Sequence, residues 1–193
     1  MTETLPVNQL LEEGGLEGSE KFWRENYQLL HDRGYQLRPR YSPDWVPSWT
    51  GTNKYFRKFE DGIYLAVSPP HIFPQEKQSH FPPQHLQICD AVHIPTGALV
   101  ALKRTDTSFH PREAELMRYL SSEPLSSDPR NHCAQLLEVF DLPDHTGHST
   151  QVLVLPWLRP FKSPTFDTVG EAVDCFRQLF EVSPFLLTHI SRS

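Results

Sequence analysis

The stretch Ala98-Leu99-Val100-Ala101-Leu102-Lys103 is an apolar run that ends in a lysine. An apolar run of this length is typical of a buried strand. A lysine at the end of such a strand either finds an anionic partner or carries its charge into a cleft at an energetic cost. The alternative interpretation is an ordinary solvent-exposed lysine at the end of a strand.

The segment after this strand predicts a helix. Pro111 is typical of a first helical turn, and Thr107 or Ser108 upstream is a capping candidate. We expect the helix to run through Leu120 and to stop before Pro124.

Helical spacing selects one carboxylate of this segment as the partner of Lys103. Glu113 lies three and four residues before the apolar Leu116 and Met117, so it shares their face. Glu115 lies on another face of the helix. We therefore expect Glu113 to be available to Lys103. The alternative is that both glutamates are solvated charges.

Composition limits the functional classes. The 193 residues carry a net charge of -6 at pH 7, which argues against a protein that binds nucleic acid or an anionic membrane. No apolar run is long enough for a membrane span, and the N-terminus does not resemble a signal peptide. The cysteines fit no metal-binding spacing and suit a reducing compartment, which predicts an intracellular, cytoplasmic location. They are Cys89, Cys133 and Cys175.

The N-terminal part predicts a flexible tail over residues 1–18 and a helix that is capped by Ser19 and ends at Gly34. The helix has one aromatic and apolar face, which we expect to pack against a neighbour. Residues 35–50 are too rich in proline for a helix or a central strand. They either wrap over the domain surface, which we favour, or form a peptide-like ligand for another protein. The aromatic and apolar face of the helix before residue 35 comprises Trp23, Tyr27 and Leu30.

Strand patterns follow along the rest of the chain. Residues 54–67 predict a hairpin, and residues 69–85 predict a proline-rich loop insert. Three histidines of this insert match no metal site by their spacing, so a solvated loop is favoured. The histidines of the insert are His71, His80 and His85. The other predicted strands are residues 86–93, 97–104, 135–142 and 151–155.

The C-terminal part predicts a proline-interrupted connector and a second long helix. This helix begins at Thr168, with Glu171 in a capping-box pattern. Val182-Ser183-Pro184 is expected to stop it, which leaves residues 182–193 as an irregular tail. The apolar face of the predicted helix comprises Ala172, Cys175, Phe176, Leu179 and Phe180.

The order of these elements is similar to the small lobe of a eukaryotic protein kinase, followed by the hinge and the start of the large lobe. In more detail, the chain resembles the fungal (basidiomycete) protein-kinase-like family over roughly residues 19–181, interrupted by the insert. The resemblance implies an α+β fold: an N-terminal helix and proline/aromatic extension at 19–57, a small lobe with an antiparallel sheet and an αC-type helix at 58–158, and the start of the large lobe at 159–181. The matching segments include Phe22-Trp23-Arg24, Arg33–Tyr41, Trp45–Trp49, Leu102-Lys103-Arg104, His110-Pro111, Leu120–Leu125, Ser127–Cys133, Leu158–Phe161 and Thr168–Val173.

The resemblance implies a nucleotide site. Lys103 would hold the phosphates of ATP, bound with Mg2+, and Glu113 would fix the lysine. Leu155 would be the gatekeeper, and the backbone from Pro156 to Leu158 would contact the adenine, with proline offering a carbonyl alone. The implied activity is ATP-dependent phosphorylation of Ser or Thr in a protein substrate.

The sequence lacks the motifs that complete a kinase active site. No Gly-x-Gly-x-x-Gly segment precedes Lys103, and no His-Arg-Asp or Asp-Phe-Gly segment follows it. Phosphoryl transfer depends on positioning and on charge stabilisation, so we expect the chain as given to be inactive and truncated before the catalytic loop. A typical intron start, GTGAGC or GTGAGT, encodes Val-Ser, the residues at positions 182 and 183, and we hypothesise that 182–193 is a translated intron. Spliced transcripts that encode Val182 to Ser193 would contradict this hypothesis.

Three interpretations follow. The first is a kinase-family chain whose complete form phosphorylates proteins. The second is a pseudokinase-like, non-catalytic interaction module that binds a partner protein. The third is a fragment that does not fold stably, because the apolar face of the 168–181 helix would be exposed. Nucleotide binding separates the first two interpretations, and cooperative unfolding tests the third.

Overall fold

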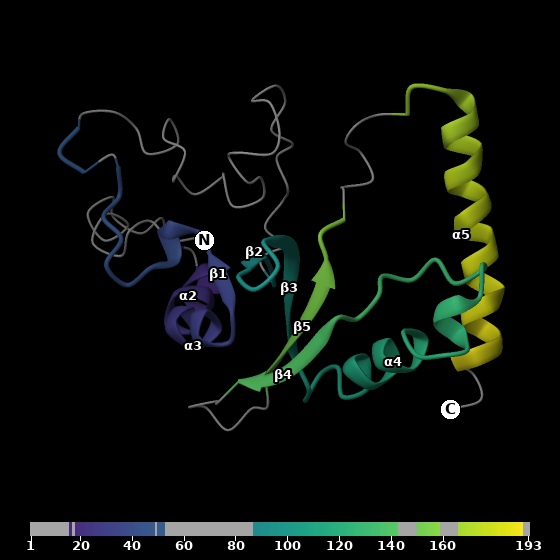
Figure 1. The fold of residues 1–193 in the computed structure, drawn as a ribbon, viewed down its shortest axis with the longest axis horizontal. Coiled ribbons are helices and arrows are strands. Elements are labelled where there is room, and N and C mark those ends of the chain that lie inside the picture. The colour runs from purple at the N-terminus through teal and green to yellow at the C-terminus, as the bar shows by residue number, and fades with distance from the viewer. Residues whose placement is uncertain are drawn as a thin grey trace, which may run out of the picture. The chain divides into compact units, whose positions relative to one another are not determined.

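The computed structural model has an α+β fold with a five-stranded antiparallel sheet in the order β1-β2-β3-β5-β4 (Figure 1). The strands are β1 (Tyr35–Leu37), β2 (Ile88–His93), β3 (Ala98–Asp106), β4 (Glu138–Leu142) and β5 (Thr150–Pro156). The α-helices are α2 (Gly18–Glu25), α3 (Tyr27–Asp32), α4 (Glu113–Leu120) and α5 (Val169–Ile190). Two short 3-10 helices are η1 (Pro39–Tyr41) and η5 (Leu125–Ser127).

The structure describes residues 16, 18–48, 50–52, 87–142, 150–158 and 166–190. The predicted hairpin at 54–67, the insert at 69–85 and most of the predicted tail at 1–18 lie outside the described residues. The chain forms two compact units, Met1–Val100 and Ala101–Ser193.

In the first unit, the predicted N-terminal helix exists as two shorter helices. Trp23 and Leu30 of the predicted face are buried, and Gly34 follows α3 at a φ of 89°, which confirms a glycine terminator. The helix begins at Gly18, so the predicted cap Ser19 lies inside it. The break falls at Asn26, whose side-chain amide donates to the carbonyl of Phe22 at 2.9 Å. Asparagine side chains compete in this way with regular helical bonding.

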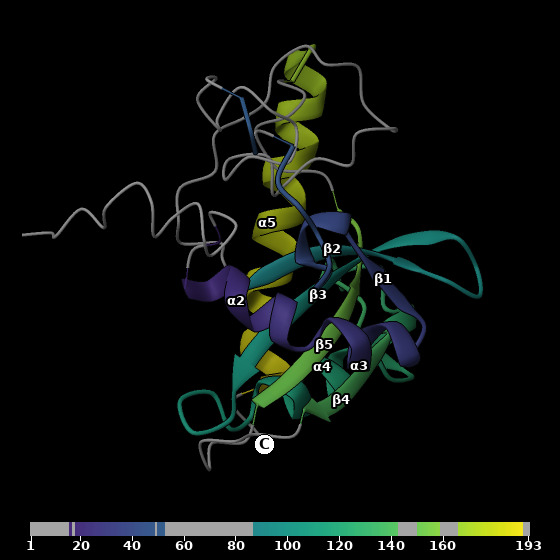
Figure 2. The ribbon, with the colours of Figure 1, turned by 90° about the vertical axis from the view of Figure 1, so that its left-hand side faces the viewer.

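The segment after α3 belongs to the sheet, as Figure 2 shows for β1. Tyr35 pairs with His93 and Leu37 pairs with Ala91, in antiparallel register. The prolines of residues 35–50 led to the prediction that this segment wraps over the domain surface. Instead, β1 ends before Pro39 and lies at the edge of the sheet. Proline is compatible with that position because an edge strand leaves one row of backbone groups outside the ladder.

Two ion pairs bind this extension to the rest of the first unit. Arg40 Nη2 lies 2.9 Å from Glu20 Oε1, and each side chain is 3% exposed. Arg38 Nε donates to both carboxylate oxygens of Asp90 on β2 at 2.8 Å. These contacts link residues from α2, η1 and β2. The extension is therefore an integral part of the first unit.

We predict that Glu20→Gln destabilises the protein far more than Glu25→Gln on the same helix. The first change leaves the charge of Arg40 buried without its carboxylate partner, which costs about 3 kcal/mol or more. Glu25 is exposed, and its change is expected to cost no more than about 0.5 kcal/mol. Urea unfolding measures both free energies. Equal effects of the two changes would contradict this account.

In the second unit, β4 and β5 pair antiparallel, with Phe140 opposite Val152 and Leu142 opposite Thr150. The core of β5 is a continuous apolar run in which successive residues are buried, and such a run is typical of a strand covered on both faces. The predicted strands 135–142 and 151–155 are confirmed, with β4 beginning three residues later than expected.

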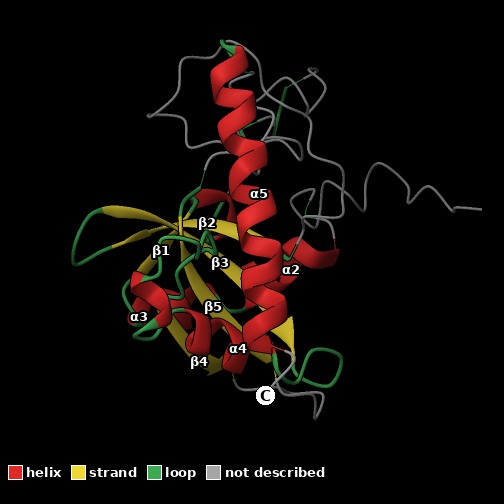
Figure 3. Ribbon diagram, turned by 90° about the vertical axis from the view of Figure 1, so that its right-hand side faces the viewer, coloured by secondary structure: helices red, strands yellow, loops and turns green. Residues whose placement is uncertain are grey.

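Helix α5 begins as predicted but does not stop where predicted. Thr168 Oγ1 accepts from the backbone N–H of Glu171 at 3.2 Å, which confirms the cap. The helix then continues through Pro184 to Ile190, so the expected irregular tail at 182–193 is wrong for residues 182–190 (Figure 3). Proline in a helix costs about 3 kcal/mol. The burial of Phe185 in a cluster with Leu120 and Leu125 offsets this cost.

We predict that Phe185→Ala lowers the free energy of unfolding by about 3 kcal/mol, because it leaves a cavity between α5, α4 and η5. Phe180→Ala on the same helix is the matched control. Its side chain is 75% exposed, so its change is expected to stay within about 0.5 kcal/mol. Urea unfolding measures the free energy of unfolding of the two variants. A small effect of Phe185→Ala would mean that the C-terminal half of α5 is not anchored by this side chain.

Candidate functional site

The structure brings Lys103 and Glu113 together. β3 continues to Asp106, so Lys103 does not end the strand as predicted. Its Nζ donates a hydrogen bond to Oε1 of Glu113, the first residue of α4. The side chains are 31% and 21% exposed, respectively. The prediction that Glu113 is the inward carboxylate is confirmed, and the alternative of two solvated glutamates is wrong for Glu113.

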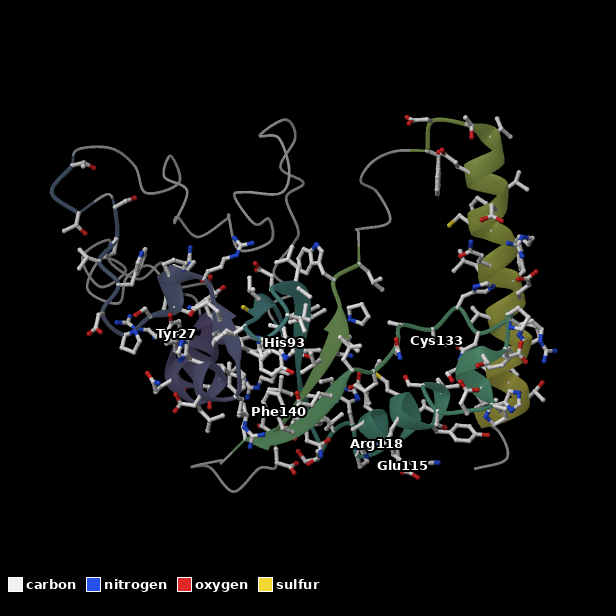
Figure 4. All side chains as sticks on the ribbon, viewed as in Figure 1. Tyr27, His93, Glu115, Arg118, Cys133 and Phe140 are labelled. Carbon is white, nitrogen blue, oxygen red and sulfur yellow. The ribbon has the colours of Figure 1, made fainter. Side chains whose placement is uncertain are left out.

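Helix α4 orients its two glutamates in different directions. Ala114 and Leu120 are its buried residues, and Glu113 lies beside this face. Glu115 is exposed and lies 3.9 Å from Arg112. Figure 4 shows Glu115 and Arg118 on the same outer side of α4.

The capping prediction for this helix is wrong. Arg112 occupies the cap position and makes no side-chain capping bond. The hydroxyl and the backbone N–H of Ser108 instead donate to the carboxylate of Asp106. The positive end of the helix dipole is compensated by the carboxylates of its first turn, Glu113 and Glu115.

Thr105 is a member of the site that sequence reasoning missed. Its Oγ1 donates to Oε2 of Glu113 at 2.7 Å, so each oxygen of the carboxylate accepts a hydrogen bond. Thr105 follows Lys103 by two residues on β3, and residues at this spacing lie on the same face of a strand. The two-residue spacing from Lys103 was the feature of the sequence that could have identified Thr105 as a member of the site.

The surroundings of Glu113 act on its pKa in opposite directions. Burial of the carboxyl group raises the pKa, whereas the hydrogen bonds from Lys103 and Thr105 lower it. The positive charges of Lys103 and His110 also lower it. The hydrogen bonds and charges outweigh burial, and the pKa lies below its ordinary value. The ionised carboxylate is therefore the form that the folded protein stabilises.

The lowered pKa of Glu113 predicts a loss of stability in acid. A carboxylate with a lowered pKa contributes stability above its unfolded value of about 4.3, and this contribution is lost as the pH falls through the folded value. The thermal midpoint of Glu113→Gln should therefore fall less steeply below about pH 5 than that of the wild type. Thermal unfolding from pH 3 to pH 7 measures this difference, with Glu115→Gln as the exposed control. Parallel curves for Glu113→Gln and the wild type would contradict the prediction.

The ammonium group of Lys103 has the capacity to bind an anion. An ammonium carries three donors, and Glu113 is the hydrogen-bond partner of Lys103 within the described residues. The lysine side chain is about one-third exposed, so a ligand oxygen can reach it from solvent. The arrangement is thus a partly exposed cation whose direction is set by a carboxylate.

The other predicted site residues lie at the end of the neighbouring strand. β5 is adjacent to β3, and Leu155 and Pro156 are its last two residues, both half-buried. Leu158 follows the strand and is 60% exposed. Their apolar side chains can form no hydrogen bond or ion pair with the side chains of Lys103 and Glu113.

The three cysteines are free thiols, and burial raises the pKa of Cys89 and Cys133, which opposes thiolate formation. No group of His, Cys, Asp and Glu side chains that could hold a metal ion occurs among the described residues. Within the same residues, no helix has the length and apolar character needed to cross a membrane.

Comparisons with family models and with curated proteins found no match for this chain.

Proposed function

We propose that this protein is a protein-kinase-like chain and that the Lys103–Glu113 pair is the phosphate-binding element of an ATP site. The observation that carries the proposal is the ion pair itself. Protein kinases use a lysine on strand β3 that pairs with a glutamate on the following helix, and both must be in place for ATP to be held productively. Here the lysine is on a strand of the antiparallel sheet and the glutamate is on the helix that follows this strand in the chain.

The proposed chemistry follows from charge. ATP phosphates are anionic, and Lys103 offers an ammonium group that Glu113 holds in one direction. Leu155 would form the apolar wall beside the adenine, and the backbone from Pro156 to Leu158 would provide its polar contacts. Mg2+ would accompany the nucleotide and neutralise part of its charge.

The proposal for this chain is nucleotide binding. The 193 residues contain neither a His-Arg-Asp segment nor an Asp-Phe-Gly segment after Lys103, so phosphorylation of Ser or Thr in a protein substrate would require residues that this sequence does not contain. The relation to the fungal kinase-like family is part of the proposal. So is an intracellular location, which is supported by the free thiols.

We predict that Mg-ATP raises the thermal midpoint of the wild-type chain by mass action. At a nucleotide concentration of 100 Kd the stabilisation is about 2.7 kcal/mol, which corresponds to roughly 5–10 °C for a chain of this size. Lys103→Ala should lose most of this increase because the phosphates lose their cation. Thermal unfolding with and without Mg-ATP measures the increase for each variant.

Arg118→Ala is the matched control, because Arg118 is an exposed cation on α4. It should keep the full ATP-dependent increase. The increase is compared within each variant, because Lys103→Ala also removes the partner of Glu113 and lowers the midpoint without ligand. An increase that persists in Lys103→Ala, or its absence from the wild type, would overturn the proposal.

The exposed face of α5 favours a second candidate function, a pseudokinase-like interaction module. Val169, Val173, Phe176 and Phe180 recur at helical spacing and are 51–82% exposed. An apolar stripe of this kind is typical of a surface that binds another protein. A cooperative thermal transition that does not respond to ATP would favour this candidate.

A further inference from the structure

We propose that Thr105 is the positioning residue of this site: its hydroxyl fixes the Glu113 carboxylate in the orientation that accepts from Lys103. The proposal rests on the proposed function for its consequence, which is tighter binding of nucleotide. Its structural content is a claim about Glu113 alone and can be tested without a ligand.

The geometry places two donors of one strand on one carboxylate. Lys103 and Thr105 are two residues apart on β3, so their side chains emerge from the same face about 6.6 Å apart along the strand. Lys103 Nζ donates to Oε1 of Glu113, and Thr105 Oγ1 donates to Oε2 at 2.7 Å. The helix thus meets the strand through a carboxylate that is held at both oxygens.

Holding both oxygens matters because the last torsion of a glutamate is soft. The χ3 angle of glutamate has a broad distribution, so a carboxylate held at one oxygen can turn about that bond. Lysine adds little restraint, because its ammonium ends a flexible four-carbon stem. Thr105 is a better anchor: it is 2% exposed, and the χ1 angle of a β-branched residue is stiff.

The role of Thr105 becomes important when Lys103 binds an anion. Phosphate oxygens compete with Glu113 for the same ammonium donors. A carboxylate that Thr105 continues to hold keeps its place beside the lysine during this competition. The lysine then presents its remaining donors in a constant direction, which lowers the entropic cost of binding.

The test compares Thr105→Val, which replaces the hydroxyl by a methyl group of similar size, with Thr105→Ser, which keeps the hydroxyl. Nuclear magnetic resonance of the side-chain carboxyl carbon reports the pKa of Glu113 in each protein. We expect the value to rise by about one pH unit in Thr105→Val, because a hydrogen bond to the charged form is lost. It should return to near the wild-type value in Thr105→Ser.

His110 is a further titratable group whose charge lowers the pKa of Glu113. The titrations are therefore repeated in a His110→Gln background, where the difference between Val and Thr at position 105 should persist. Thermal unfolding at pH 7 confirms that each variant is folded. Thr105→Ala replaces Thr105→Val if the added methyl group prevents folding.

The second readout is the Kd of the full chain for Mg-ATP by calorimetry. Thr105→Val should weaken binding about tenfold, the scale of one hydrogen bond to a charged group, and Thr105→Ser should restore it. An unchanged pKa of Glu113 in Thr105→Val overturns the proposal. If the wild-type chain binds ATP, a Kd of Thr105→Val equal to that of the wild type also overturns it. If the wild type binds no ATP, the proposed function fails, and the titration of Glu113 alone decides the role of Thr105.

Discussion

The ion pair between β3 and α4 joins a strand to the helix that follows it, and its degree of burial explains what it can do. Lys103 and Glu113 are each between one-fifth and one-third exposed. Glu20 and Arg40 form the contrasting pair, with 3% exposure on each side. Full burial makes desolvation expensive, and such a pair fixes a structure mainly because breaking it is costly. The partly exposed pair of Lys103 and Glu113 keeps its attraction and still reaches solvent, which a ligand-binding cation requires.

Most of the sheet could be predicted from the sequence because its strands are marked locally. The apolar runs before Lys103 and in β5 specify strands without reference to distant residues. The choice of Glu113 over Glu115 also needs local information alone, since helical geometry determines which of two nearby side chains shares the apolar face. These expectations are confirmed because secondary structure and packing favour the same arrangement.

The features that could not be predicted depend on contacts between distant residues. β1 is three residues long, and its register is set by pairing with β2, more than fifty positions later in the chain. The continuation of α5 through Pro184 depends on Phe185, whose partners Leu120 and Leu125 lie on other elements. For α5 the local signal was a proline, and tertiary burial outweighed it. For β1 the prolines lie after the strand, and they led to one prediction for the whole segment 35–50. Thr105 was overlooked for a different reason: a single hydroxyl on a strand carries no signal until its acceptor is located.

The absence of a glycine-rich segment before Lys103 limits how tightly the proposed site can bind. In protein kinases, such a segment covers the phosphates, and the lysine is one contact among several. One hydrogen bond to a charged group contributes about 1.5–3 kcal/mol, whereas even a millimolar Kd corresponds to about 4.1 kcal/mol. Lys103 therefore accounts for part of a weak affinity, and apolar contacts such as those proposed for Leu155 must supply the remainder. In such a site a small loss of lysine orientation is a large fraction of the binding energy, so the restraint on Glu113 matters more here than in a site with many phosphate contacts.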